Sequence, residues 1–309
     1  MQLTRRSFTS GALSVVLGGP LAAPVLAQSD RQMAAALNAI RGLGEAELSF
    51  NHLPGMTLGL VTPDGRRSVL NFGYADLEAR TSISVDTLFQ VGSITKLMVA
   101  ALLHQFAAEG KLRLTDRVSD LMPQIPLPRG EPIQVQHLLD HSAGLPGDSP
   151  VYPDGGLWTS YAPGAHWHYS NTGYEILGKL AEHVAGKPLA QLLRERIFTP
   201  LGMSRSRGAI IGADRQLYAQ GYEPADQFAP YVRGVPLAPA PWVDVTFGAG
   251  CVASTASDMM SLLEALASAA KGKGGLGLSP GAARQFTQHA VPSDMPAMTY
   301  GNGIMHVGD

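Results

Sequence analysis

The chain has 309 residues, of which 45% are hydrophobic and 16% are charged, and its formal net charge is −2. This much apolar sequence is enough to fill the core of one large domain or of two closely packed lobes. The sequence has no basic surplus and no basic run, so we expect no nucleic-acid partner. Its single cysteine, Cys251, excludes an intramolecular disulfide.

The first 27 residues have the composition of an export signal. Residues 4–8 read Thr-Arg-Arg-Ser-Phe, residues 11–27 carry no charge, and a Val-Leu-Ala sequence closes the stretch, as at a signal-peptidase site. A membrane anchor is the alternative, but the uncharged stretch is short and interrupted by glycine and proline. We therefore predict a twin-arginine signal peptide at residues 1–27, a periplasmic or secreted protein, and no stable membrane insertion after cleavage.

Periodicity and turn residues divide the rest of the chain into helices and strands. Hydrophobic residues at helical spacing predict helices at residues 32–48, 93–110, 171–185 and 256–270. Runs rich in β-branched and aromatic residues predict strands at residues 55–61, 67–74, 87–91 and 299–307. Pro-Asp-Gly at residues 63–65 is typical of a turn that joins the first two strands into a hairpin.

This order of elements predicts an α+β fold in which an antiparallel sheet is flanked by helices and lies beside a large helical lobe. We place one domain at residues 28–309, with an α/β lobe formed by residues 28–92 and 290–309 and a mainly helical lobe at residues 93–289. The strands of this sheet are few for a core of this size. We therefore expect the C-terminal strands of the sheet to lie beyond Asp309.

The most informative motif is Ser-Ile-Thr-Lys at residues 93–96, at the start of a predicted helix. A serine one turn before a lysine shares a face with it, so the hydroxyl of Ser93 and the amine of Lys96 should meet. The positive end of the helix dipole disfavours a second positive charge and should help Lys96 lose its proton. A neutral lysine beside a serine is a nucleophile with its own base. The alternative is a serine helix cap beside a solvated lysine.

A second motif, Tyr-Ser-Asn at residues 169–171, lies just before another predicted helix. A tyrosine near a lysine can act as a phenolate or as a proton shuttle, because the positive charge stabilises its anion. The amide of Asn171 can donate hydrogen bonds to a substrate and accept them from it. The alternative is that Tyr169 is a buried structural residue and Asn171 a helix cap.

Together, the two motifs resemble those of serine β-lactamases and penicillin-binding proteins, in the branch that holds class C β-lactamases, D-alanyl-D-alanine carboxypeptidases and related carboxylesterases. The resemblance covers essentially all of the chain after residue 27. Other stretches with similar counterparts in that family lie at residues 54–56, 86–96, 137–146, 163–174, 200–203 and 250–258.

The resemblance implies a role for each residue. Ser93 would attack the carbonyl carbon and carry the acyl group, and Lys96 would be the general base. Tyr169 would pass the proton to the leaving group, and Asn171 would orient the acyl side chain. The oxyanion hole would use the backbone N–H of Ser93 and one from a late strand. The reaction would need no metal and no organic cofactor.

The resemblance leaves the substrate open among a small-molecule ester, a D-amino-acid peptide and a β-lactam, and it leaves the oligomeric state open. We favour esterase or peptidase activity slightly over β-lactamase activity. A non-catalytic domain that binds β-lactams or cell-wall peptides, or an inactive fragment, is the alternative from another class.

The third motif of the family, Lys or His followed by a small residue and Gly, has no secure counterpart. His306-Val307-Gly308 fits the letters but lies within the predicted last strand. We expect the true motif beyond Asp309.

Four other features carry an alternative chemistry. Gly-Leu-Ser-Pro-Gly at residues 277–281 matches the nucleophile elbow of α/β-hydrolases, but we expect Ser279 to be a helix cap because no strand precedes it. His137 and His141 are spaced like zinc ligands, yet no third ligand is evident, so we expect structural roles. His166 and His168 could line the cleft or be solvated. We expect Cys251 to be a small core residue.

Overall fold

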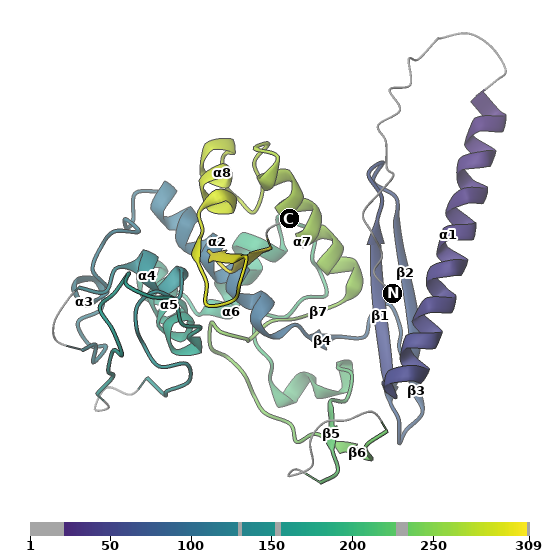
Figure 1. Cartoon of the computed structure of the whole chain (residues 1–309), viewed down its shortest axis with the longest axis horizontal. Helices are drawn as coiled ribbons and strands as arrows, with labels where there is room; N and C mark the ends of the chain where they lie inside the picture. The colour runs from purple at the N-terminus through teal and green to yellow at the C-terminus, as the bar shows by residue number, and fades with distance from the viewer. Residues whose placement is uncertain (1–21, 129–131, 152–155, 227–233, 308–309) are drawn as a thin grey trace. The chain divides into compact units, whose positions relative to one another are not determined.

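The computed structural model describes residues 22–128, 132–151, 156–226 and 234–307 (Figure 1). By contacts the chain divides into two units, Met1–Glu47 and Leu48–Asp309. The first contains most of helix α1 (Ala22–Asn51), which extends beyond the predicted residues 32–48 at both ends. Residues 1–21, most of the predicted signal peptide, lie outside the described residues. Among those that are described, no helix is long and apolar enough to cross a membrane.

The second unit begins with the predicted hairpin. Strands β1 (Gly55–Val61) and β2 (Arg67–Asp76) pair antiparallel, from Gly55 opposite Gly73 to Val61 opposite Arg67. Strand β3 (Thr81–Ser82) extends this sheet beside β2, after an irregularity in the register at residues 74–76. One face of the sheet packs against helix α7 (Ala256–Ala270). A side chain at Gly59 would lie 2.9 Å from Met260 of α7, so glycine permits this close approach.

Helix α2 (Thr95–Ala108) is the central helix of the second unit. All of its residues from Thr95 to Phe106 are buried, which is expected of a helix surrounded by other elements. It packs against α5 (Asn171–Ala185), α6 (Leu189–Leu193) and α8 (Pro280–Gln288) (Figure 1). The predicted helices 171–185 and 256–270 have the bounds observed for α5 and α7.

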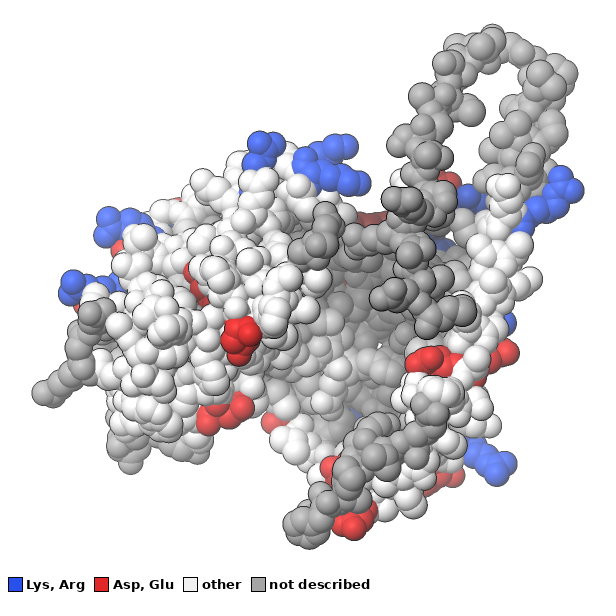
Figure 2. Space-filling model, viewed as in Figure 1, with Lys and Arg blue, Asp and Glu red and all other residues white. Residues whose placement is uncertain are grey.

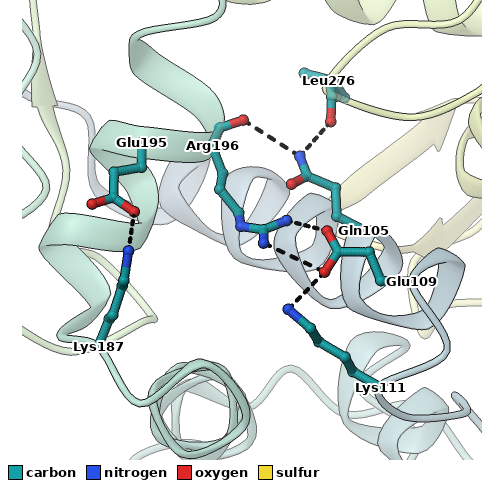
Figure 3. Close-up of polar contacts among 7 residues, drawn as sticks. All are labelled: Gln105, Glu109, Lys111, Lys187, Glu195, Arg196 and Leu276. Carbon is teal, nitrogen blue, oxygen red and sulfur yellow. Dashed lines mark hydrogen bonds and ion pairs between the residues drawn. The ribbon is translucent and has the colours of Figure 1, made fainter.

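The C-terminal end of α2 is anchored by polar contacts (Figure 3). Gln105 donates to the carbonyl oxygen of Leu276 at 2.7 Å and to that of Arg196 at 3.4 Å. The Arg196 guanidinium binds Glu109, which also pairs with Lys111 at 2.7 Å. Exposed ion pairs stabilise a protein by only about 0–1 kcal/mol each, so the buried amide of Gln105 and the packing around it fix this end of the helix.

The predicted last strand, residues 299–307, is wrong as a single strand, because the chain forms a hairpin there. Strand β9 (Met298–Gly301) pairs with β10 (Ile304–Val307) on one side and with β8 (Val291–Pro292) on the other. Asn302 and Gly303 have φ angles of 53° and 80°, the backbone of a tight two-residue hairpin turn.

This turn lies against the first residues of α2. A side chain on Gly303 would come within 2.5 Å of the backbone nitrogen of Leu97. No strand of the β8–β10 sheet pairs with β1–β3 among the residues that the structure describes. The prediction that residues 28–92 and 290–309 form one lobe therefore stays a prediction.

Short elements complete the second unit. Strand β4 (Phe89–Gln90) pairs with β7 (Ala253–Ser254) and is shorter than the predicted strand 87–91. The remaining helices and strands are α3 (Val118–Leu121), α4 (Val135–Leu139), the π-helical turn η2 (Arg194–Phe198), the 3-10 turn η3 (Gly212–Leu217), β5 (Tyr222–Pro224) and β6 (Leu237–Pro239). Small antiparallel sheets with a large helical part confirm the predicted α+β class.

On the face shown in Figure 2, the coloured Lys, Arg, Asp and Glu side chains lie singly or in small groups among uncharged surface. The expectation that the protein binds no nucleic acid stays a prediction.

Candidate active site

Ser93 lies in the short connection between β4 and α2. It is exposed and belongs to the 3-10 turn η1 (Gly92–Ile94), so the α-helix begins at Thr95 and not at Ser93 as predicted. Val252 holds this connection on both sides: its carbonyl oxygen accepts from the N–H of Val91 at 3.0 Å, and its N–H donates to Oγ1 of Thr95 at 3.1 Å. The nucleophile candidate is therefore presented to solvent on a fixed turn.

Lys96 lies one turn further on, and only 1% of its surface is exposed. Its Nζ donates to Oγ of Ser93 at 3.1 Å, to Oδ1 of Asn171 at 2.7 Å and to the carbonyl oxygen of Ala249 at 2.9 Å. These three acceptors match the three hydrogens of an ammonium group. The predicted approach of the serine hydroxyl to the lysine amine is confirmed, and the alternative of a solvated lysine is wrong.

Burial lowers the pKa of Lys96 from its ordinary value of 10.5 to about 8, while the negative charge of Asp148 acts in the opposite direction. The main cause is thus the loss of hydration, whereas the sequence pointed to the helix dipole. A pKa of about 8 leaves about one molecule in ten with a neutral Lys96 at pH 7, a fraction large enough for general-base catalysis.

Tyr169 approaches the same point from the loop before α5. Its ring centroid lies 4.8 Å from Nζ of Lys96, and its phenol lies close enough to Ser93 for the serine to affect its pKa. Burial raises the pKa of Tyr169 above its ordinary value, the interaction with the Ser93 side chain lowers it, and the charge of Asp148 raises it further. A tyrosine with a raised pKa keeps its proton at neutral pH, which favours the proton-shuttle interpretation over the phenolate.

Asn171 is the first residue of α5, but it is not the helix cap. Ser170 is the cap, and its hydroxyl accepts from the N–H of Gly173 at 3.0 Å. The Asn171 side chain is therefore free for the site: Oδ1 accepts from Lys96, and Nδ2 donates to Oδ1 of Asp148 at 2.7 Å. In this structure Asn171 orients the lysine, and its predicted contact with an acyl side chain stays a prediction.

Two site groups were missed by sequence reasoning. Asp148 is an exposed carboxylate in the loop after residues 137–146, and no local pattern marks it. The carbonyl of Ala249 belongs to a Gly-Ala-Gly turn that is pressed against α5, since a side chain at Gly248 would lie 2.5 Å from the carbonyl oxygen of Tyr174. The glycines of this turn were a usable signal, because they permit the backbone to come this close.

The alternative nucleophile Ser279 is a helix cap, as predicted. Its hydroxyl accepts from the N–H of Ala282 at the start of α8, and Pro280 is the first helical residue. Cys251 is fully buried in the main hydrophobic core, also as predicted.

His137 and His141 have the structural roles that the sequence predicted. Nδ1 of His137 accepts from the N–H of Gln134 at 3.2 Å, and Nδ1 of His141 accepts from the N–H of Ser170 at 3.1 Å. Within the described ranges, no group of three or more His, Cys, Asp or Glu residues is placed to hold a metal ion.

The histidines around Trp167 are both exposed. His166 packs edge-on against Tyr161, with ring centroids 5.3 Å apart. His168 lies beside Gly147, and so borders the loop that carries Asp148. His306 lies in β10 opposite Thr299, and its buried Nε2 has no hydrogen-bond partner among the described residues. The position of the third motif stays a prediction.

Several known proteins are similar to this chain in sequence or in structure. The β-lactamase of Pseudomonas fluorescens is 31% identical over an alignment of 175 residues that covers 53% of this chain and 49% of that protein. The D-amino acid amidase of Ochrobactrum anthropi SV3, complexed with L-phenylalanine amide, has a TM-score of 0.68 and 27% identity, covering 87% of this chain and 80% of that one. EstCE1, a hydrolase with promiscuous acyltransferase activity, is similar in fold, with a TM-score of 0.71, 21% identity, and coverage of 91% and 84%.

The chain spans about half the length of the curated relatives it matches. A family model named Beta-lactamase matches residues 39–307, which include Ser93, Lys96, Tyr169 and Asn171. The chain therefore belongs to the β-lactamase family, a family of serine hydrolases.

Proposed function

We propose that this protein hydrolyses ester or amide bonds through an acyl-enzyme on Ser93. The observation that carries the proposal is the contact between a buried amine and an exposed hydroxyl: Nζ of Lys96 lies 3.1 Å from Oγ of Ser93. Because the pKa of Lys96 is lowered to about 8, the amine can accept the hydroxyl proton near neutral pH without a histidine.

In the proposed acylation, neutral Lys96 takes the proton of Ser93 as Oγ attacks the carbonyl carbon of the substrate. The N–H of Ser93 lies in the 3-10 turn η1 just before α2, and in this proposal it donates to the oxyanion and stabilises it. Tyr169 then gives its proton to the leaving group as the carbon–oxygen or carbon–nitrogen bond breaks, and it regains a proton from Lys96. Water attacks the acyl group in the second half and restores Ser93.

The charge of Asp148 supports a class of substrate. Its carboxylate is exposed, is bonded to Asn171, and raises the pKa of both Lys96 and Tyr169. A protonated amine in the acyl part of a substrate would be attracted to this position, and a carboxylate there would be repelled. The similar structure of an amidase bound to an amino acid amide agrees with this preference. We therefore propose amino acid amides and esters as the preferred substrates.

A pair of matched substrates tests this preference. Phenylalanine amide and 3-phenylpropionamide differ only in the α-amine. We expect wild-type kcat/KM to be at least about tenfold higher for the amine-bearing amide, and Asp148→Asn to abolish this ratio without abolishing hydrolysis of a neutral p-nitrophenyl ester. A wild-type ratio near one would remove the amine preference, and equal ratios in the wild type and Asp148→Asn would remove the role of Asp148. In either case, loss of all activity in Ser93→Ala would still support Ser93 as the nucleophile.

β-Lactamase activity, and capture of β-lactams without turnover, remain the alternatives from the same site. Both start with acylation of Ser93 and differ in the rate at which water removes the acyl group. A chromogenic cephalosporin separates them: continuous colour formation indicates a β-lactamase, and a single burst of one equivalent indicates a binding protein.

We also propose export through the twin-arginine pathway. Residues 4–8 and the uncharged stretch that follows support it. Fusing residues 1–27 to a reporter that is active only outside the cytoplasm tests the proposal, with Arg5→Lys and Arg6→Lys together as the control that should prevent export.

A further inference from the structure

His141 has a backbone conformation that costs free energy. It is only 1% exposed and has a φ angle of 59°, in the left-handed region that favours glycine. A residue with a side chain is strained there by about 1–2 kcal/mol. Such strain persists only where surrounding contacts maintain it, and it is frequent near functional sites.

The hydrogen bonds of His141 bracket Tyr169 in the sequence. Its carbonyl oxygen accepts from the N–H of His168 at 2.9 Å, and its Nδ1 accepts from the N–H of Ser170 at 3.1 Å. One residue thus fixes the backbone immediately before and immediately after Tyr169. The left-handed backbone is what turns both acceptors toward the same segment.

The imidazole ring also contacts the tyrosine ring. The ring centroids of His141 and Tyr169 are 4.3 Å apart, and the planes are inclined by 42°. Tyr300 and Tyr174 contact the same imidazole, with centroids at 4.6 Å and 5.1 Å. The hydroxyl of Tyr174 is itself held, because it donates to the carbonyl of Leu139 at 2.9 Å. The imidazole is therefore held among aromatic rings, and its contact limits the movement of Tyr169.

The imidazole N–H of His141 is a second unfavourable feature of this residue. Because Nδ1 accepts a hydrogen bond, the proton of the neutral ring is on Nε2, which is buried without a partner in the described structure. Burial, with the charge of Lys96 and of His168, lowers the pKa of His141 to about 3, so the ring stays neutral. A strained backbone and an unpaired buried N–H at one residue are difficult to explain by stability alone.

We propose that His141 is a positioning residue that holds Tyr169 with its hydroxyl at Ser93, an inference that rests on the function proposed above. It neither touches the substrate nor transfers a proton. Its two acceptors set the backbone of Tyr169, and its ring sets the direction of the phenol. A misplacement of about 1 Å at such a group can reduce a rate by about a hundredfold.

Two substitutions separate these contributions. Asparagine and glycine both tolerate the left-handed backbone, and both remove the ring, but only asparagine keeps an acceptor at the position of Nδ1. We expect kcat to fall by about tenfold in His141→Asn and by about a hundredfold in His141→Gly, with KM within about twofold of the wild type. Hydrogen exchange at the N–H of Ser170 should stay slow in His141→Asn and become faster in His141→Gly.

The same substitutions in a Tyr169→Phe background provide the decisive comparison. A positioning residue should lose its effect once the hydroxyl it positions is absent, so we expect each His141 substitution to change kcat less than about twofold there. Ile197→Val, a buried change of about 1 kcal/mol distant from these contacts, is the control for general destabilisation and should leave kcat unchanged in both backgrounds.

Equal losses of kcat in both backgrounds, or unchanged kcat and Ser170 exchange in both His141 variants, would overturn the proposal. If His141→Gly does not fold, the proposal is tested by His141→Asn alone, whose effect on kcat should be smaller in the Tyr169→Phe background than in the wild type. If Tyr169→Phe alone leaves kcat unchanged, the proposed proton route is wrong, and the exchange of the Ser170 amide still decides whether His141 holds this segment.

Discussion

Replacing Lys96 with methionine should change the pH dependence of stability by a known amount. Methionine is similar in length and carries no charge, so the variant keeps the packing but loses the buried amine. The wild-type pKa of about 8, against 10.5 in the unfolded chain, means that the folded protein binds fewer protons than the unfolded one between these two pH values. The stability of the wild type should therefore rise with pH across this window.

The expected size follows from those two pKa values. A tenfold change in equilibrium is about 1.4 kcal/mol. The free energy of unfolding of the wild type, minus that of the variant, should therefore increase by about 2.5 kcal/mol between pH 7 and pH 10. Lys96 is 1% exposed, so solvent screens little of this effect. The difference in stability between the two proteins at pH 7 alone is less informative, because methionine also leaves Oδ1 of Asn171 and the carbonyl oxygen of Ala249 without the donor that Lys96 provides.

Urea unfolding at pH 7, 8, 9 and 10 measures this difference. Lys96→Ala serves as the control: it also lacks the amine, so its stability should differ from that of Lys96→Met by the same amount at every pH. A wild-type-minus-methionine difference that changes by less than about 0.5 kcal/mol over this range would show that the ammonium is not desolvated in the folded protein.

Three further predictions follow from the site and its support. The kcat/KM for a neutral ester should rise about tenfold per pH unit below pH 8 and level above it, because only neutral Lys96 is a base. Asp148→Asn should move this inflection to lower pH, since the charge of Asp148 raises the pKa of Lys96. Gly303→Ala should lower the free energy of unfolding, measured in urea, by about 1–2 kcal/mol or more, because Gly303 has a φ of 80° and lies against the backbone of Leu97. Gly65→Ala is the control: Gly65 has a φ of 83° but open space around it, so this substitution measures the backbone strain alone.

Local geometry explains what the sequence predicted well. The spacing of Ser93 and Lys96 predicts their contact, because it depends only on one turn of helix. The hairpin of β1 and β2 depends on alternating strands and a Pro-Asp-Gly turn, and its first strand has the predicted bounds. Helices α5 and α7 are closed by local signals and were likewise predictable.

Contacts between residues that are distant in the sequence account for most of what the sequence did not predict. Asp148 reaches Asn171, and the carbonyl of Ala249 reaches Lys96, through loops that are distant in sequence. No local pattern marks Asp148, and the glycines beside Ala249 indicate a close backbone approach but not its partner. The burial that lowers the pKa of Lys96 is likewise a property of the packed fold. The missed hairpin at Asn302-Gly303 is different: an Asn-Gly pair between apolar runs is a strong turn signal, and it was present in the sequence.

The most direct test of the central claim is to locate the acyl group on the protein. The full chain is mixed with a p-nitrophenyl ester, quenched in acid during the burst of p-nitrophenol, digested, and analysed by mass spectrometry. We predict one acyl group on the peptide that contains Ser93, and no adduct and no hydrolysis in Ser93→Ala. An acyl group on Ser279 or any other residue, or undiminished hydrolysis by Ser93→Ala, would contradict the proposed mechanism.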